Sequence, residues 1–220
     1  FINLVAMKVT DKIELYNCDN MELMAKYPDG YFSLAICDPP YGIGIDGQKK
    51  SINKNPKHNR KEHDKKNWDN AIPTKEYFDE LFRVSKKQII FGGNYFTEFL
   101  PPVKSWIFWF KGQNDLTMSD GELLWTNLDI VTRQITVNRG QLNSQNTFHP
   151  TEKPYKVYKH LLQKYAKPND KILDTHSGSA SLAIACHDYG FELVGCELDK
   201  EYYDKGIERV KNHVSQQKLF

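Results

Sequence analysis

Paired cysteines are missing from this sequence. Its four cysteines, Cys18, Cys37, Cys186 and Cys196, stand far apart and form no CxxC spacing, which argues against a structural zinc site or a thioredoxin-like redox motif. We therefore expect reduced, buried thiols. No apolar run reaches the roughly 18 residues of a membrane span, and the chain does not start with a basic segment followed by a long apolar one. These absences predict a soluble, cytoplasmic protein.

Net charge is also small, at +2 over 220 residues, so any cationic surface must be local. The composition, 40% hydrophobic and 26% charged, supports one core and hence a single catalytic domain over residues 1–220. Basic residues gather at about 44–68, where they face only three acids and almost no aliphatic residues. Such a stretch predicts an exposed flexible loop. Its cations are Lys49, Lys50, Lys54, Lys57, Arg60, Lys61, Lys65 and Lys66.

Strand and helix patterns follow one another along the chain. Apolar or β-branched runs predict strands at Lys12–Cys18, Phe32–Cys37, Gln88–Phe91, Ser105–Phe110, Glu122–Trp125, Ile130–Val137, Lys171–Asp174 and Glu192–Glu197. Helical spacing predicts helices at Met21–Ala25, Thr74–Val84, Pro154–Tyr165, about 181–189 and from Lys200 onward. This order predicts an α/β fold with a mostly parallel sheet, helices on both faces and an antiparallel edge formed by the runs at 105–110 and 130–137.

The tetrapeptide DPPY, residues 38–41, directly follows the apolar run 32–37, where open α/β sheets place their ligand sites. Asp38 supplies a carboxylate acceptor, and Pro39 has a carbonyl but no N–H. Pro40 stiffens the turn, and Tyr41 offers a flat ring for stacking on a planar base. Two acceptors aimed at a base amino group would stabilise the charge that develops on its nitrogen as it attacks a methyl group. The alternative is a proline-stiffened surface turn.

A second turn of small residues follows the predicted strand at 171–174. It runs from Thr175 to Ser181 and opens a helix, so its backbone N–H groups can approach a ligand closely. About 20 residues later Glu197 ends the next strand, where an acid commonly accepts hydrogen bonds from a ribose. The turn is not GxGxxG, and a plain strand-to-helix connection would also explain it.

Four ordered blocks together resemble the DNA amino-methyltransferases of the permuted β-group, the N6-adenine and N4-cytosine family. They are ICDPPYG (36–42), FGGNYF (91–96), SDGELLWT (119–126) and HPTEKP (149–154). The resemblance implies a circularly permuted, Rossmann-like methyltransferase fold that uses S-adenosylmethionine and requires no metal. It also implies a bacterial or phage-infected host cell, with a homodimer and a cognate restriction enzyme as conceivable partners.

The same resemblance assigns roles to individual residues. Asp38 and Pro39 would accept from the target amino group, and Tyr41 would stack on the base. Asp19 would contact the cofactor adenine, Thr151 and Lys153 its carboxylate, and Glu197 its ribose. The cofactor turn would comprise Asp174, Thr175, His176, Gly178 and Ser179. Asp19 as a solvated acid and Thr151 as a helix cap are the alternatives. His176 and Ala180 depart from the phenylalanine and glycine usual in the family, so we expect cofactor binding to survive with altered affinity.

The aspartate of DPPY favours adenine N6 as the target, since cytosine N4 enzymes more often resemble a serine form. The base must leave the duplex to be reached, and the basic loop, with Arg133 and Arg139, would supply phosphate contacts that offset this cost. Cytosine N4 and RNA adenine remain alternative targets. A catalytically silent nucleic-acid-binding module and a nicotinamide-dependent oxidoreductase are alternatives of other classes.

Overall fold

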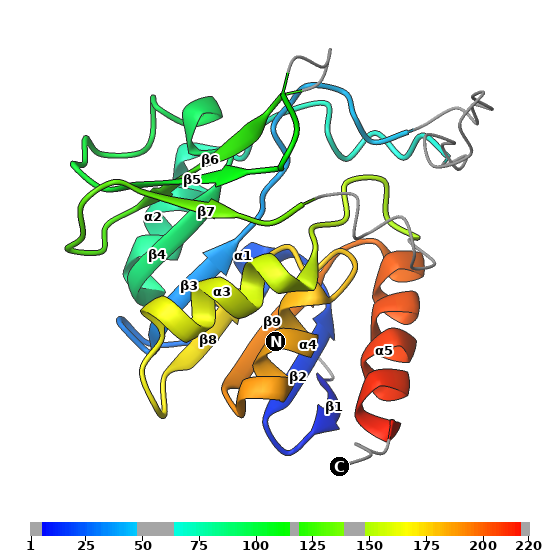
Figure 1. The fold of residues 1–220 in the computed structure, drawn as a ribbon. Helices are drawn as coiled ribbons and strands as arrows, with labels where there is room; N and C mark the ends of the chain where they lie inside the picture. The colour runs from blue at the N-terminus through cyan, green and yellow to red at the C-terminus, as the bar shows by residue number, and fades with distance from the viewer. Residues whose placement is uncertain (1–5, 48–63, 115–118, 139–147, 217–220) are drawn as a thin grey trace.

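One open sheet forms the centre of the molecule (Figure 1). The structure, a computed structural model, describes residues 6–47, 64–114, 119–138 and 148–216. Within these ranges nine strands pair in the order β1-β2-β9-β8-β3-β4-β6-β5-β7. They are β1 (Ala6–Thr10), β2 (Ile13–Asn17), β3 (Phe32–Cys37), β4 (Ser85–Phe91), β5 (Trp106–Phe110), β6 (Gly121–Thr126), β7 (Arg133–Thr136), β8 (Lys171–Asp174) and β9 (Glu192–Glu197).

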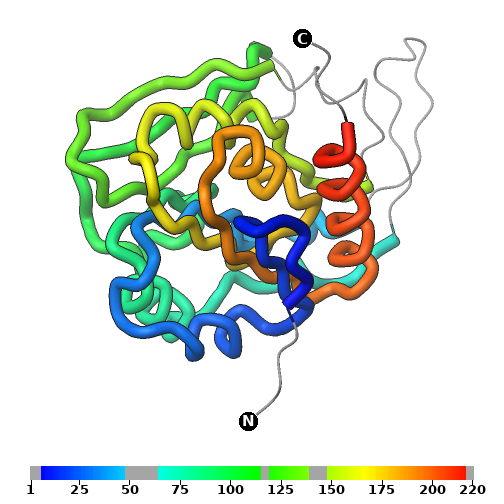
Figure 2. The backbone as a smooth tube through the Cα atoms, turned by 90° about the horizontal axis from the view of Figure 1, so that it is seen from below, coloured from blue at the N-terminus to red at the C-terminus, as the bar shows by residue number. Residues whose placement is uncertain are grey.

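Helices cover both faces of this sheet, as Figure 2 shows from below. Two helices, α1 (Asn20–Met24) and α2 (Lys75–Val84), lie together on one face, whereas α3 (Tyr155–Tyr165), α4 (Ser181–Tyr189) and α5 (Lys200–Ser215) cover the other. A 3-10 turn, η2 (Gly93–Tyr95), follows β4. The middle helix of the second face, α4, is buried from Ser181 to Cys186. Because α4 packs between its neighbours, residues 181–186 are apolar or small on every side of the helix.

The five central strands run parallel, and helices cover both of their faces. In β3, Leu34 pairs with Ile172 of β8 and with Lys87 of β4, and all of β3 except Ser33 is buried. A strand covered by helices on both faces reads as a continuous apolar run. Parallel pairing places the carboxyl ends of β2, β9, β8, β3 and β4 at one edge of the sheet, which is where such sheets bind their ligands.

Most of these helices and strands were predicted from the sequence. The strands β3, β8 and β9 lie at their predicted bounds, and the predicted helices are present, with Thr74 and Pro154 as the N-cap residues of α2 and α3. The predicted antiparallel edge is present, but the two runs at 105–110 and 130–137 are parallel to each other as β5 and β7. Antiparallel pairing involves β6, which lies between β4 and β5, and β1, which pairs with β2. Strand β1 was not predicted, because its residues are half exposed.

Two predictions from composition can be compared with the structure. All four cysteines are free and buried, which confirms the expected thiols. Across the described ranges, none of the helices is both long and apolar enough to cross a membrane. The greater part of the basic loop, including Lys49, Lys50, Lys54, Lys57, Arg60 and Lys61, lies outside the described residues, as does Arg139.

Candidate active site

The DPPY turn leaves the carboxyl end of β3, in the middle of the sheet. Its shape is held by Asp69, whose buried carboxylate accepts hydrogen bonds from three backbone N–H groups. Tyr41 and Gly42 donate to Oδ1 at 2.7 and 2.8 Å, and Ile45 donates to Oδ2 at 2.9 Å. Such charge-assisted bonds are stronger than neutral ones. This role of Asp69 could not be predicted from the sequence, because Asp69 lies 28 residues beyond Tyr41.

Asp38 lies in a cluster of buried charges. The Tyr41 hydroxyl donates to Asp38 Oδ1 at 2.7 Å, and Lys153 Nζ donates to Asp38 Oδ2 at 2.6 Å. A second carboxylate, Glu122 of β6, lies 3.2 Å from the same hydroxyl and 3.5 Å from the same ammonium. Lys111 pairs with Glu122 at 2.9 Å. Two carboxylates and two ammonium groups therefore balance one another, as buried charges require.

Burial and pairing act in opposite directions on the pKa values of this cluster. Burial, only partly opposed by the Lys153 ammonium, holds the pKa of Asp38 above its ordinary value. For Glu122, burial is outweighed by Lys153 and Lys111, so that its pKa falls below the ordinary value. The pKa of Tyr41 is well above its ordinary value because of burial and the two neighbouring carboxylates. Tyr41 therefore keeps its proton and acts as a hydrogen-bond donor.

The Tyr41 ring lies against the segment after β4. It stacks on Tyr95 of η2, with ring centroids 4.9 Å apart and planes inclined by 12°. Gly92 has a φ of +66°, and a Cβ atom there would lie 2.3 Å from the Tyr41 ring. Glycine is needed both for this backbone conformation and for the close approach. The FGGNYF block, residues 91–96, thus fixes the ring of the DPPY tyrosine.

The small-residue turn lies beside this cluster, between β8 and α4. Its Gly178 has a φ of +48° and donates its N–H to Glu197 Oε2 at 2.8 Å, while Asp199 N–H donates to Oε1 at 2.9 Å. Burial raises the pKa of Glu197. Asp174, at the end of β8, accepts from His176 N–H at 3.2 Å, and burial raises its pKa to about 7.

His176, which replaces the aromatic residue usual at its position, is half-buried and neutral. Burial lowers its pKa to about 4. The Asn20 amide nitrogen lies 3.1 Å from Nε2 and the Thr175 hydroxyl 2.9 Å from Nδ1, so Nε2 accepts and Nδ1 carries the proton. The His176 ring meets Tyr77 edge-on at 5.3 Å. Hydrogen bonds, and not stacking alone, hold this imidazole beside the turn.

The remaining predicted cofactor residues lie in different settings. Asp19 ends the segment after β2 and caps α1 by accepting from Met21 N–H at 2.8 Å. Thr151 lies 3.3 Å from His149 Nδ1, and since Pro154 is the N-cap of α3, the alternative of Thr151 as a helix cap is wrong. Lys153 is 6% exposed and directs its ammonium to Asp38. Its charge is thus already balanced by a protein carboxylate.

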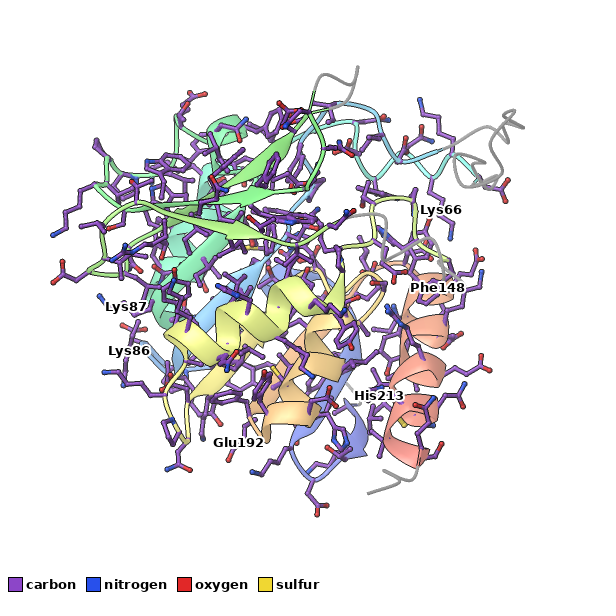
Figure 3. The ribbon with its side chains drawn as sticks, in the orientation of Figure 1. Lys66, Lys86, Lys87, Phe148, Glu192 and His213 are labelled. Atoms are coloured by element: carbon purple, nitrogen blue, oxygen red, sulfur yellow. The ribbon has the colours of Figure 1, made fainter. Side chains whose placement is uncertain are left out.

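Of the predicted nucleic-acid contacts, Lys66 is already paired. Its ammonium lies 2.9 Å from Asp199, 2.7 Å from Glu201 and 4.1 Å from the centroid of the Tyr202 ring, beside the first turn of α5 (Figure 3). It therefore anchors the end of the basic loop to α5. Lys65 and Arg133 are exposed and carry cations that a phosphate could reach.

Three carboxylates lie at the ends of neighbouring strands, around the small-residue turn. Asp19, Glu197 and Asp174 follow or end β2, β9 and β8, which are neighbours in the sheet. Acceptors at this place fit a ligand with hydroxyl and amino groups, such as S-adenosylmethionine. A mostly parallel α/β sheet, with this turn and the DPPY turn at one edge, defines the fold of the S-adenosylmethionine-dependent methyltransferases.

Comparisons with known proteins agree with this class. A family model described as DNA methylase matches residues 98–208, just over half of the chain. The type II methyltransferase M.HpaI of Haemophilus parainfluenzae is 23% identical over 240 aligned positions, covering 88% of this chain and 73% of that protein. The chain spans only 30% and 25% of two Escherichia coli (strain K12) methylases, one a DNA adenine methyltransferase, which it matches over shorter stretches at 36% and 32% identity.

Solved structures share the fold. The M1.HpyAVI–SAM complex superposes with a TM-score of 0.60 at 19% identity, covering 89% of this chain and 98% of that one. The cytosine-N4-specific PvuII DNA methyltransferase gives a TM-score of 0.59 at 14% identity, with 93% of each chain covered. By the family model that it matches, this chain belongs to the DNA methylase family.

Proposed function

We propose that this chain transfers the methyl group of S-adenosylmethionine to N6 of an adenine flipped out of DNA. The observation that carries the proposal is the half-buried Asp38 carboxylate that follows β3, held between Tyr41 and Lys153 at the same sheet edge as the small-residue turn. Membership of the DNA methylase family supports methylation of DNA. The relatives include adenine and cytosine-N4 enzymes, so the adenine target rests on the aspartate of DPPY.

The proposed reaction needs positioning and electrostatic stabilisation. S-adenosylmethionine, when bound, supplies an electrophilic methyl group on a sulfonium centre. Asp38 accepts a hydrogen bond from the target amino group and thereby stabilises the positive charge that grows on its nitrogen. The Pro39 carbonyl is the second acceptor, and the Tyr41 ring holds the base in the plane from which the amino group can attack. The DPPY turn is pre-shaped for this task because Asp69 fixes its backbone.

Binding of the cofactor rests on the acceptors around the small-residue turn. Glu197 suits ribose hydroxyls, although both of its oxygens also hold backbone N–H groups. Asp174 suits an ammonium group, which would lower the raised pKa of this carboxyl on binding. Asp19 retains one oxygen beyond its capping bond and suits an adenine amino group. Thr151 is the better candidate for the cofactor carboxylate, since Lys153 is engaged with Asp38.

DNA contact is proposed for the basic loop at about 44–68 and for Arg133. The exposed Lys65 lies at the described end of this loop, and phosphate contacts there would offset the cost of flipping a base. A homodimer would enlarge the contact surface. A cognate restriction enzyme is a further proposed partner, and the similarity to a type II methyltransferase supports it.

The experiment is transfer of tritiated methyl from S-adenosylmethionine to amplified, and therefore unmethylated, bacterial genomic DNA. Nuclease digestion and mass spectrometry then identify the modified nucleoside. We expect N6-methyladenine. N4-methylcytosine would keep the mechanism and correct the base, methylation of RNA alone would contradict the DNA substrate, and no transfer to any nucleic acid would contradict the enzyme.

A matched pair of variants tests the assigned acceptor. Asp38→Asn keeps the size of the side chain but removes the charge that stabilises the attacking nitrogen, so transfer should fall by roughly 100-fold or more. Binding of S-adenosylmethionine, measured by calorimetry, should change little. Asp129→Asn is the control, since the Asp129 side chain is 88% exposed and pairs with the exposed Lys104 at 2.8 Å. Loss of cofactor binding in Asp38→Asn would contradict the role of Asp38.

A further inference from the structure

Both carboxylate oxygens of Asp38 already accept a hydrogen bond. Its Oδ1 accepts from the Tyr41 hydroxyl at 2.7 Å and its Oδ2 accepts from Lys153 Nζ at 2.6 Å. Each oxygen keeps a second lone pair, so a target amino group can still donate to Asp38, but it then shares an oxygen whose negative charge already serves another donor. Because buried donors are costly to leave unpaired, a displaced hydroxyl needs another acceptor within reach.

Glu122 is that acceptor. The Tyr41 hydroxyl has a single proton and two carboxylates near it, Asp38 at 2.7 Å and Glu122 Oε2 at 3.2 Å. A rotation of the O–H bond, without movement of the ring, transfers the hydrogen bond from one carboxylate to the other. The ring can therefore stay stacked on Tyr95 while the donor is withdrawn from Asp38.

The charges around Glu122 make it able to receive this bond. Its side chain is 17% exposed and pairs with Lys111 at 2.9 Å and with Lys153 at 3.5 Å. Two cations keep the carboxylate ionised, and an ionised acceptor binds a hydroxyl about twice as strongly as a neutral one. Glu122 also shares the Lys153 ammonium with Asp38, which weakens the hold of Lys153 on Asp38 alone.

We infer that Glu122 is a positioning residue that takes over the Tyr41 hydroxyl when the target amino group binds Asp38, and so leaves Asp38 Oδ1 to the base alone. The inference rests on the proposed function and deepens it, because it adds a residue from β6 to the reaction. Glu122 touches neither the base nor the cofactor in this account and acts only through Tyr41, Asp38 and Lys153.

A double-mutant cycle tests the inference. Glu122→Gln keeps the size of the side chain but replaces an ionised acceptor by a neutral one, so kcat on a mapped target oligonucleotide should fall about tenfold. Tyr41→Phe removes the hydroxyl that has to be relocated. In that background Glu122→Gln should lower kcat by less than about threefold, since only its effect through Lys153 is left.

Two further measurements separate this role from a structural one. The affinity for S-adenosylmethionine and the urea midpoint of unfolding should change little in Glu122→Gln when compared with Glu192→Gln, whose carboxylate is 58% exposed at the opposite edge of the sheet (Figure 3). An equal loss of kcat in the presence and absence of the Tyr41 hydroxyl would overturn the inference, as would an unchanged kcat. A wild-type protein that methylates no nucleic acid would overturn the proposed function and the inference with it. If the wild type is active but the effects of the two substitutions on kcat are independent of each other, the inference alone is overturned.

Discussion

Asp174 is predicted to make the protein less stable as the pH rises towards neutrality. Burial raises its pKa from 3.8 to about 7. Between these values the folded protein keeps the proton while the unfolded chain releases it, so the folded state binds more protons and its stability falls with increasing pH. The loss is absent below about pH 4 and complete above about pH 7. At about 1.4 kcal/mol per pH unit, it amounts to about 4 kcal/mol.

Asp174→Asn removes this titration without changing the size of the side chain. Urea unfolding followed by tryptophan fluorescence, from about pH 4.5 to about pH 7.5, gives the free energy of unfolding of both proteins. We expect the wild type to lose several kcal/mol relative to the variant across this range. Groups that both proteins share, such as His176, cancel in the difference. Asp129→Asn, at an exposed carboxylate, should show no such fall. A constant difference between wild type and Asp174→Asn would refute the reasoning.

Three further predictions concern residues that hold the site in place. Arg209 donates to Ser179 O at 2.8 Å and pairs with the buried Glu152 at 2.9 Å. Arg209→Met should therefore lower the free energy of unfolding in urea by roughly 3 kcal/mol and weaken cofactor binding. An unchanged cofactor affinity would contradict the role of Arg209 in holding the small-residue turn. Gly92→Ala should push the Tyr41 ring away and lower kcat about tenfold or more while cofactor affinity stays unchanged, because a Cβ would lie 2.3 Å from that ring. Lys66→Met should leave the salt dependence of DNA binding unchanged, since the charge of Lys66 is already balanced by Asp199 and Glu201. If Lys66 instead contacts a phosphate, the slope of the logarithm of the binding constant against the logarithm of the salt concentration should become shallower by about 0.9.

The local patterns of the sequence were sufficient for most of the fold. The run 32–37 could be assigned as a strand because burial on both faces leaves it almost continuously apolar, and 171–174 and 192–197 could be assigned because short apolar stretches lie between turn residues. Pairing was harder to predict. The path of the chain across the sheet decides that β5 and β7 are parallel and that β6 lies between β4 and β5. The residues of one strand do not indicate the direction of the strand beside it.

Some parts of the candidate site could likewise be predicted from the sequence, and others could not. DPPY, the small-residue turn and Glu197 could be found in the sequence, because each is a short segment that directly follows or ends a recognisable strand. Glu122 and Asp69 could not, and Lys153 was expected to bind the cofactor, although it lies against Asp38 from 115 residues away. The sequence by itself therefore determined the strands and the chemistry placed at their ends, since both depend on neighbouring residues. Only the tertiary structure decided which buried charges meet, because a charge taken out of water must find its partner in space and not along the chain.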